Sequence, residues 1–246
     1  MVVNTAGFCS EEVSNHAIML LLACAKKLTI LNDVVKRGGW TGDTRNEIGT
    51  MGPIDGQTLG LIGLGNIARA TARKAGVFGL EVIAHDPYVE PWIAREYRVE
   101  LVPSMEELAR RSDYVSVHVP LNPETRGLVG ESFYQSMKPT AFIINTCRGG
   151  TVDERALVAA LRNGELAGAG LDVFETEPTP KDNPLLAMDN VIVTPHSAGT
   201  SIASRRRAPV QIGQEAARVL RGSWPMSLAN PQVRARIAAR PPASGV

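Results

Sequence analysis

The stretch "LIGLGNIARA" (Leu61–Ala70) determines which fold this sequence predicts. An apolar run ends here, helix-forming sequence begins, and the pattern Gly63-x-Gly65-x-x-Ala68 lies at the junction. In a strand–turn–helix unit, the first glycine permits the tight turn, the second lets the backbone approach a pyrophosphate, and the small third residue allows the helix to pack closely on the strand. The phosphates would lie at the N-terminus of the helix, where free N–H groups and the helix dipole favour anions. The pattern therefore predicts a dinucleotide site.

An acidic residue follows at the spacing that such a site requires. The next predicted strand ends at Asp86, 21 residues after Gly65, close to the roughly 20 that are typical of a ribose-binding acid. A carboxylate here accepts hydrogen bonds from the adenosine ribose and repels a 2′-phosphate. We therefore expect NAD as the cofactor in preference to NADP. The alternative is a glycine turn with a surface Asp after a strand.

Short apolar strands alternate with helical segments from residue 58 onward. The strands contain nearly continuous runs of β-branched residues, which indicates that helices cover both faces of the sheet. We predict strands at residues 58–63, 80–86, 99–102, 114–120, 141–146, 167–173 and 191–196. We predict helices at 66–78, 104–112, 131–137, 153–163 and 202–221. Ser104 and Glu107 have the spacing of a capping box. The predicted fold class is α/β, a doubly wound parallel sheet of the Rossmann type.

The apolar run Ala17–Ala25 predicts a buried helix rather than a targeting segment. No Lys or Arg precedes it, whereas a secretory signal begins with basic residues. Its nine apolar residues are too few to span a bilayer, which takes about 20. As a helix, the segment begins at Ser10, ends with Lys26 and Lys27, and repeats apolar residues at helical spacing: Val13, Ala17, Leu20, Leu21, Cys24 and Leu28. The Gly-rich sequence at 36–57 predicts a loop.

Composition excludes several classes of function. A net charge of +1 gives no electrostatic basis for binding nucleic acid or an anionic membrane. The three cysteines form no CxxC pair, so neither a disulfide framework nor a zinc site is indicated, and no metal is expected. A reducing cytoplasm is the expected location. The last residues, "RPPASGV" (240–246), predict a disordered tail.

Three further segments carry chemically active side chains at predicted strand ends, where open α/β sheets bind ligands. They are "NTCRGGTVDERAL", "GLDVFETEP" and "VTPHSAG". Arg148 can hold a carboxylate and polarise a carbonyl. His196 can exchange the proton that accompanies a hydride, and Glu177 can pair with the imidazolium and fix its orientation. This set is chemically sufficient for hydride transfer.

These motifs resemble the D-isomer-specific 2-hydroxyacid dehydrogenase family. The resemblance includes "HVPLNPETRGLVG", "MKPTAFIINTCRGG" and "LLAMDNVIVTPH" in the same order along the chain. It implies an NAD-dependent oxidoreductase that interconverts a D-2-hydroxy acid and its 2-keto acid. In that case Arg148 binds the substrate, His196 is the acid/base, and Glu177 is its acidic partner. Glu175 competes for the last role, and the spacing from Asp172 favours Glu177.

The resemblance also assigns a cofactor site. The residues expected around NAD are Gly63, Gly65, Asn66, Ile67, Asp86, Thr125, Thr146, Cys147, Arg148, Asp172, His196 and Gly199. Asp172 has the alternative role of capping the loop after its strand. Cys147 stands where the family usually has Ala or Ser, and we interpret it as a small inert side chain rather than a reactive thiol. We interpret His118 as structural or close to the adenine, and His16 and His85 as structural.

A second domain is also implied by the resemblance. In the family, about 100 residues, the size of a small domain, precede the segment that begins here at Asn4, and they form most of a substrate-covering domain. We therefore expect residues 1–199 to be the NAD-binding domain, with Met1 at a domain boundary. Residues 200–246 would be a helix and tail that return toward the substrate domain.

The partners implied are a small 2-hydroxy or 2-keto acid and a second copy of the chain. The homodimer is expected because the family pairs through the first helix of this domain, whereas neither nucleic acid nor a membrane is expected as a partner. The alternative function, from another class, is a non-catalytic NAD(H)-binding module with a redox-sensing or scaffold role.

Overall fold

The structure, a computed structural model, describes residues 1–238 and contains two compact units. One unit is Ser10–Gly199, and the other combines Met1–Cys9 with the chain from Thr200 onward. In the second unit Val3 forms an antiparallel bridge with Leu228, and the Asn4 N–H donates to the Ser227 carbonyl at 3.1 Å. The first nine residues thus pack with the C-terminal segment, whereas the sequence predicts that they belong to the nucleotide domain. The expected disordered tail at 240–246 lies outside the described residues.

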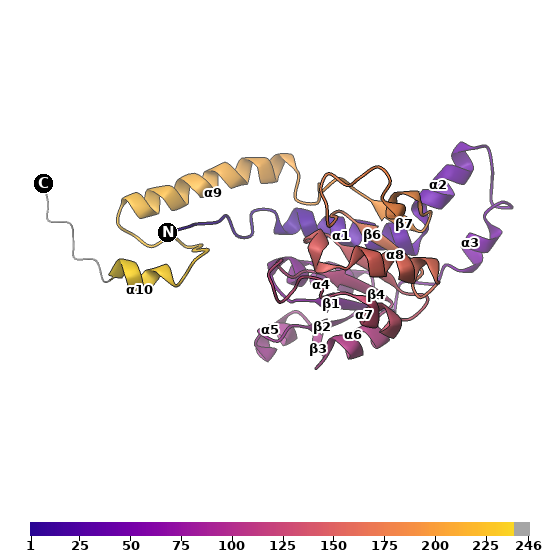
Figure 1. The fold of residues 1–246 in the computed structure, drawn as a ribbon, viewed down its shortest axis with the longest axis horizontal. Helices are drawn as coiled ribbons and strands as arrows, with labels where there is room; N and C mark the ends of the chain where they lie inside the picture. Colours follow the sequence, from indigo (N-terminus) through magenta and orange to yellow (C-terminus); the bar gives the residue numbers. More distant parts are fainter. Residues whose placement is uncertain (239–246) are drawn as a thin grey trace, which may run out of the picture. The chain divides into compact units, whose positions relative to one another are not determined.

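The unit Ser10–Gly199 is built on a seven-stranded parallel sheet (Figure 1). Its strands are β1 (Thr58–Ile62), β2 (Glu81–His85), β3 (Glu100–Leu101), β4 (Tyr114–Val117), β5 (Phe142–Asn145), β6 (Gly168–Leu171) and β7 (Val191–Val193). Their order in the sheet is β3-β2-β1-β4-β5-β6-β7. The chain winds outward in opposite directions from β1 and β4, so the carboxyl ends of these two neighbours border the crevice where such sheets bind ligands. The predicted doubly wound parallel sheet is confirmed.

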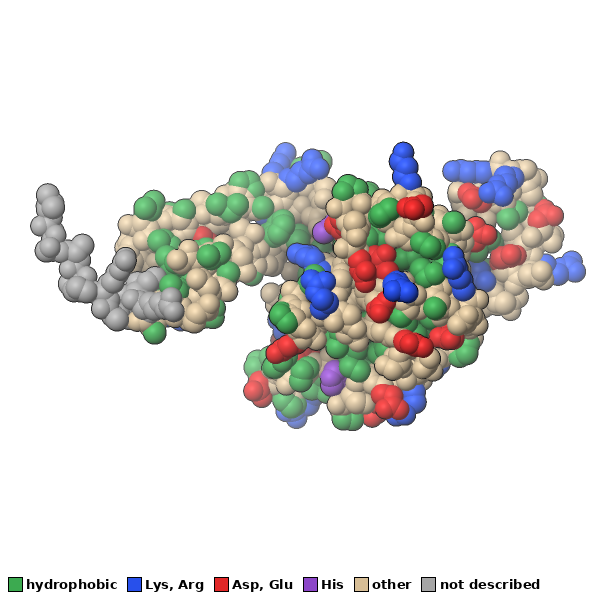
Figure 2. Space-filling view, in the orientation of Figure 1, with side chains coloured by type: hydrophobic (Ala, Val, Ile, Leu, Met, Phe, Trp, Pro, Cys, Tyr) green, Lys and Arg blue, Asp and Glu red, His purple; other side chains and the backbone are tan. Residues whose placement is uncertain are grey.

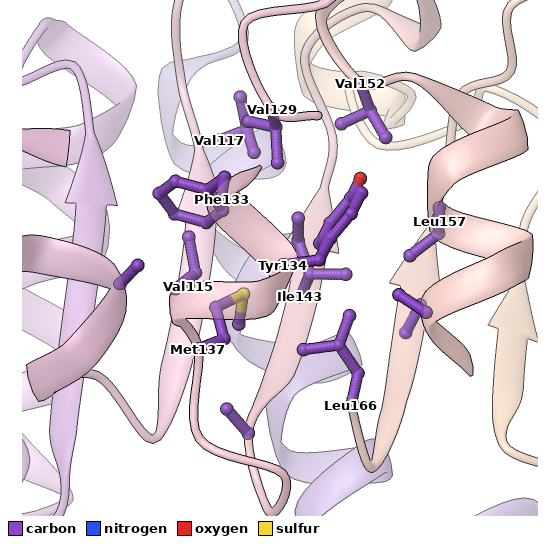
Figure 3. Packing of buried hydrophobic residues seen from close by; sticks show 14 of the residues in the cluster. Val115, Val117, Val129, Phe133, Tyr134, Met137, Ile143, Val152, Leu157 and Leu166 are labelled. Atoms are coloured by element: carbon purple, nitrogen blue, oxygen red, sulfur yellow. The ribbon is translucent and has the colours of Figure 1, made fainter. Parts of the chain in front are cut away.

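Helices cover both faces of this sheet. One face carries α1 (Ser10–Ala25), α4 (Asn66–Val77) and α5 (Pro91–Glu96), and the other carries α6 (Met105–Arg111), α7 (Glu131–Ser136) and α8 (Glu154–Arg162). Successive strand residues point to opposite faces: Leu61 joins the α1 and α4 cluster, whereas Ile62 joins the α6–α8 cluster. Figure 3 shows the second cluster, in which Phe133 and Tyr134 of α7 pack beside residues of β4 and β5. The central strands are therefore buried on both sides.

Two short helices extend the chain where the sequence predicts no helix. Leu28 does not continue the buried stripe of α1; it begins α2 (Leu28–Lys36) and is 58% exposed. The reason is a turn at Lys27, whose φ of 48° breaks the helix after Ala25. Helix α3 (Arg45–Gly49) lies inside the segment predicted as a loop. The helix α5 was not predicted either, because its Pro91 start and six residues give too short a periodic pattern.

The smaller unit contains α9 (Ile202–Leu220) and α10 (Val233–Ala238). The α9 helix begins at a capping box in which the Ser201 hydroxyl accepts a hydrogen bond from the Ser204 N–H. Hydrophobic side chains are exposed on the surface of this unit (Figure 2). On α9 the exposed hydrophobic residues include Val210, Ile212 and Leu220. None of the helices within residues 1–238 combines the length and the apolar character needed to cross a membrane.

Candidate active site and cofactor cleft

The loop after β1 has the backbone geometry that a dinucleotide site requires. Gly63 has a φ of 85°, and a Cβ there would lie 2.9 Å from Val119 Cγ1, so the turn needs glycine. A Cβ at Gly65 would meet no described atom within 4 Å, which leaves the approach to the backbone open. Asn66 and Ile67 then form the first turn of α4, where amide groups lack helical acceptors and favour an anion.

Asp86 follows β2 and braces this loop. Its Oδ2 accepts a hydrogen bond from the Leu64 N–H at 2.8 Å, and its Oδ1 accepts one from the Tyr88 N–H at 2.9 Å. Each carboxylate oxygen has two lone pairs, so acceptor capacity remains for ribose hydroxyls. A cavity of about 320 Å³ opens beside Asp86. Besides Asp86, its walls include Gly63, Gly65, Tyr88, His118, Val119, Glu124 and Thr125.

Thr125 holds the turn that forms one wall of this cavity. Its hydroxyl donates to the Pro120 carbonyl at 2.5 Å, and its N–H donates to Asn122 Oδ1 at 2.9 Å. His118 lies nearer the sheet, with its Nε2 2.9 Å from the Ser116 hydroxyl. Burial lowers the pKa of His118 to about 4, so the ring is neutral at physiological pH. Thr125 and His118 therefore shape the cavity without adding charge to it.

The loop after β5 carries Arg148 and is held by a buried asparagine. Asn145 donates from its side-chain nitrogen to the Arg148 carbonyl at 3.1 Å and accepts from the Cys147 N–H at 3.0 Å. The Arg148 side chain is exposed, and its Nη1 donates to the Cys147 carbonyl at 2.6 Å. Burial raises the pKa of the Cys147 thiol, which keeps it protonated at neutral pH. Thr146 is buried, and its hydroxyl has no hydrogen-bond partner among residues 1–238.

His196 and Glu177 form a directly hydrogen-bonded pair. The His196 Nδ1 lies 2.6 Å from Glu177 Oε2, and Glu177 Oε1 accepts a hydrogen bond from the Phe174 N–H at 3.0 Å. Burial raises the pKa of Glu177, but the hydrogen bonds from His196 and Phe174 and the charge of His196 together lower it by more, so the pKa lies below its ordinary value. The carboxylate engages Nδ1, and the imidazole Nε2 is left for proton exchange. His196 is 48% exposed, which gives a substrate access to this ring.

Asp172 lies beneath the segment that carries His196 and is completely buried. Its carboxylate accepts hydrogen bonds from the Thr194 hydroxyl at 2.5 Å, the Ser197 N–H at 2.9 Å and the Ala198 N–H at 2.8 Å. Its backbone carbonyl accepts from the His196 N–H at 2.8 Å. Of the two roles expected for Asp172, these contacts correspond to capping the loop. Gly199 directly follows this capped segment.

The sheet brings these loops to one edge. Strands β5, β6 and β7 are parallel neighbours, so the loops with Arg148, Asp172 and His196 leave the same edge as the Gly-rich loop after β1. Three residues at this edge are not among those that the sequence predicts for the site. Asn145 and Thr194 make hydrogen bonds within these loops, and Gly149 lies against the Phe174 backbone. Asn145 had a detectable signal, since a buried amide at the end of an apolar strand needs hydrogen-bond partners.

The residues at this edge fit an NAD molecule. The open space at Gly65 suits a pyrophosphate, the cavity beside Asp86 suits an adenosine, and the orphaned Thr146 hydroxyl offers a polar contact further along the same edge.

Comparisons with known proteins agree with this geometry. Residues 18–198 match the family model described as D-isomer specific 2-hydroxyacid dehydrogenase, NAD binding domain. The chain is 40% identical over 230 residues to a D-3-phosphoglycerate dehydrogenase from Methanocaldococcus jannaschii, covering 94% of this chain and 43% of that relative. It is 39% identical over 241 residues to a glyoxylate reductase from Korarchaeum cryptofilum, covering 98% of this chain and 71% of that relative.

A solved structure with the same architecture is the apo form of D-mandelate dehydrogenase from Rhodotorula graminis. It superimposes with a TM-score of 0.85 at 33% identity, covering 92% of this chain and 67% of the other. The sheet, the Gly-rich loop and the comparisons together define a dinucleotide-binding domain. The chain belongs to the D-isomer-specific 2-hydroxyacid dehydrogenase family, and the cofactor of this domain is NAD. It spans less than half of the D-3-phosphoglycerate dehydrogenase that it matches.

Proposed function

We propose that this chain supplies the cofactor-binding and proton-transfer half of an enzyme that interconverts a D-2-hydroxy acid and its 2-keto acid. The observation that carries the proposal is the His196–Glu177 pair, with Nδ1 and Oε2 2.6 Å apart. An oriented imidazole on the sheet edge that also carries the Gly-rich loop is the minimum needed for proton exchange beside a nicotinamide. When bound, NAD supplies the hydride acceptor, or the hydride donor in the reduced form.

His196 acts as the general acid in the direction of reduction and as the base in the direction of oxidation. Its Nδ1 is engaged by Glu177, so the proton moves to or from the substrate oxygen at Nε2. The Glu177 carboxylate stabilises the imidazolium because opposite charges in contact favour the charged form of each partner. Glu175 has a different task, since its carboxylate accepts from the Glu154 N–H at the start of α8.

Arg148 binds the substrate carboxylate and polarises the reacting carbonyl. The exposed guanidinium uses one N–H on the Cys147 carbonyl, and its four other N–H donors remain for a planar carboxylate. That interaction places the 2-keto carbon near the sheet edge and explains why the substrate class is a 2-keto or 2-hydroxy acid.

The remaining site residues hold the two halves of the cofactor. We assign the pyrophosphate to the Gly63–Ile67 loop and the adenosine ribose to Asp86, whose charge disfavours a 2′-phosphate. Around the nicotinamide half we place Thr125, Thr146, Cys147, Asp172 and Gly199. Asp172 acts there through the segment it caps, because its own side chain is completely buried.

We also propose that two copies of the chain associate, and that they work in the cytoplasm. Helix α2 buries none of its residues, and Trp40 after it is 69% exposed, which leaves apolar surface for a second subunit to cover. The cytoplasmic assignment is supported by the free thiols of Cys24 and Cys147.

The test is NADH oxidation by this chain with glyoxylate, pyruvate and hydroxypyruvate. We expect turnover with at least one acid, and we expect His196→Gln to abolish it while NADH binding persists. Glu177→Gln should lower kcat about a hundredfold, whereas the matched Glu175→Gln should leave it within about threefold, since Glu175 only caps a helix. A parent chain that binds NADH but turns over none of the three acids contradicts the proposal and favours a non-catalytic binding module.

A further inference from the structure

We propose that His16 is a positioning residue for the site: through Thr194 it holds Asp172 and thereby the backbone of residues 194–198, which carries His196. His16 lies on α1, far from this segment in the sequence. Its effect on turnover rests on the proposed function, whereas its effect on the conformation of His196 does not.

Three side chains form the chain of contacts. The His16 Nε2 lies 2.8 Å from the Thr194 hydroxyl oxygen and 3.5 Å from Asp172 Oδ1. The Thr194 hydroxyl in turn lies 2.5 Å from Asp172 Oδ1. The His16 side chain is 15% exposed and Asp172 is completely buried, so water cannot readily replace these contacts.

The number of available hydrogens determines which group donates in each of these contacts. An ionised Asp172 only accepts hydrogen bonds, so the single hydroxyl hydrogen of Thr194 must point toward it. The Thr194 oxygen can then serve His16 only as an acceptor, and His16 must carry its proton on Nε2. The order is therefore His16 N–H to Thr194, and Thr194 O–H to Asp172.

This order matters because Asp172 organises the segment that carries His196. Its side chain accepts the Ser197 and Ala198 N–H groups, and its backbone carbonyl accepts the His196 N–H. His196 itself has a φ of 51°, a conformation that residues with a side chain rarely adopt and that persists only when neighbours hold it. Turning the carboxylate away from these amides releases that constraint.

The other two histidines lack such a connection to His196. The His85 Nδ1 contacts the Val102 carbonyl at 3.1 Å, and the His118 Nε2 contacts the Ser116 hydroxyl. Both histidines line the cavity beside Asp86, whereas His196 lies in the segment after β7. They therefore serve as internal references for a change confined to His196.

Histidine NMR on the chain itself tests the proposal, because the sequence contains only four histidines. Thr194→Val removes the hydroxyl at similar volume, and Thr194→Ser keeps it. We expect the valine variant to shift the His196 ring signals and leave those of His85 and His118 in place, and we expect the serine variant to restore the parent spectrum. Nitrogen shifts should show His16 protonated at Nε2.

A second pair of variants acts on His16 directly. Gln can place an N–H near the position of Nε2, so His16→Gln should preserve the His196 signals, whereas His16→Leu should move them as Thr194→Val does. Unchanged His196 signals in Thr194→Val, an Nδ1–H tautomer at His16, or equal shifts of all four histidines would each overturn the proposal.

Kinetics separate this inference from the proposed function. If the parent is active, Thr194→Val should lower kcat between roughly tenfold and a hundredfold, as expected for a misplaced catalytic group, and should weaken NADH binding by a smaller factor. If the parent is inactive, the proposed function fails and the NMR comparison still decides the positioning role. A tenfold loss of NADH affinity with parent-like His196 signals contradicts positioning through residues 194–198.

Discussion

Gly149 follows Arg148 at the place where the loops after β5 and β6 touch. A Cβ at this position would lie 1.9 Å from both the carbonyl carbon and the oxygen of Phe174, and 2.4 Å from the Glu175 nitrogen. Ordinary van der Waals contact begins at 3.4 Å, so Gly149→Ala requires a displacement of 1.5 Å (3.4 − 1.9). All three obstructing atoms belong to the backbone, and no rotamer change can relieve the overlap.

The expected cost follows from that displacement. Overpacking that side chains can absorb costs about 1–3 kcal/mol, and here the backbone of the loops after β5 and β6 must move instead. We expect Gly149→Ala to lower the free energy of unfolding by about 3 kcal/mol or more, the range of severe core defects. Gly150→Ala is the matched control, because its Cβ would first meet the ends of the Arg126 and Leu121 side chains at 3.2 Å. That variant should cost less than about 1 kcal/mol.

Urea denaturation monitored by circular dichroism measures both variants, and NADH titration follows the site. In Gly149→Ala the loop with Arg148 moves away from the segment that leads to Glu177. The activity of the folded variant should therefore also fall, beyond the loss caused by the unfolded fraction. If the free energies of unfolding of the two alanine variants differ by less than about 0.5 kcal/mol, the close contact between the two loops is refuted.

Two further predictions concern the cofactor cavity. Asp86→Asn keeps an acceptor for the Leu64 N–H but removes the charge. The ratio of the NADPH and NADH dissociation constants, measured by fluorescence titration, should therefore fall about tenfold, or about 1.4 kcal/mol. An unchanged ratio contradicts the assignment of Asp86. Burial lowers the pKa of His118 from 6.5 to about 4. The unfolded chain therefore binds a proton in this window that the folded chain does not, and stability falls as the pH drops from 6.5 toward 4, by at most about 3 kcal/mol. Between pH 7 and 4.5, urea denaturation should show a smaller loss of unfolding free energy for His118→Gln than for the parent. Equal losses contradict the role of His118 in this pH dependence.

The elements that the sequence predicts well are those whose signals are local. Gly63 and Gly65 identify their strand–turn–helix unit because the backbone conformation of a glycine is determined within a few residues. The seven predicted strands are all present, and their apolar runs correspond to burial on both faces. The cap at Ser104 is likewise local, and the Glu107 N–H donates to its hydroxyl at 3.1 Å.

The predictions that fail concern where regular segments end and what covers them. Leu28 has the right spacing to extend the stripe of α1, yet the left-handed turn at Lys27 directs it to solvent. Residues 1–9 were grouped with the domain that follows them, and the structure pairs them with residues near 228. Both predictions rest on neighbouring residues in the sequence. Neighbouring residues do not show which distant segment a chain end packs against.

The sequence by itself determined the fold class, the cofactor and the candidate chemical residues Arg148, Glu177 and His196, because each stands in a short motif whose residue types suit a defined chemistry. Tertiary structure alone decided how these groups are held. The contact of His16 with Thr194 joins positions 178 residues apart, and Gly149 needs its lack of a side chain because of Phe174 on another strand's loop. Such constraints arise from parallel strands that bring separate loops to one edge, and packing at that edge depends on the whole sheet.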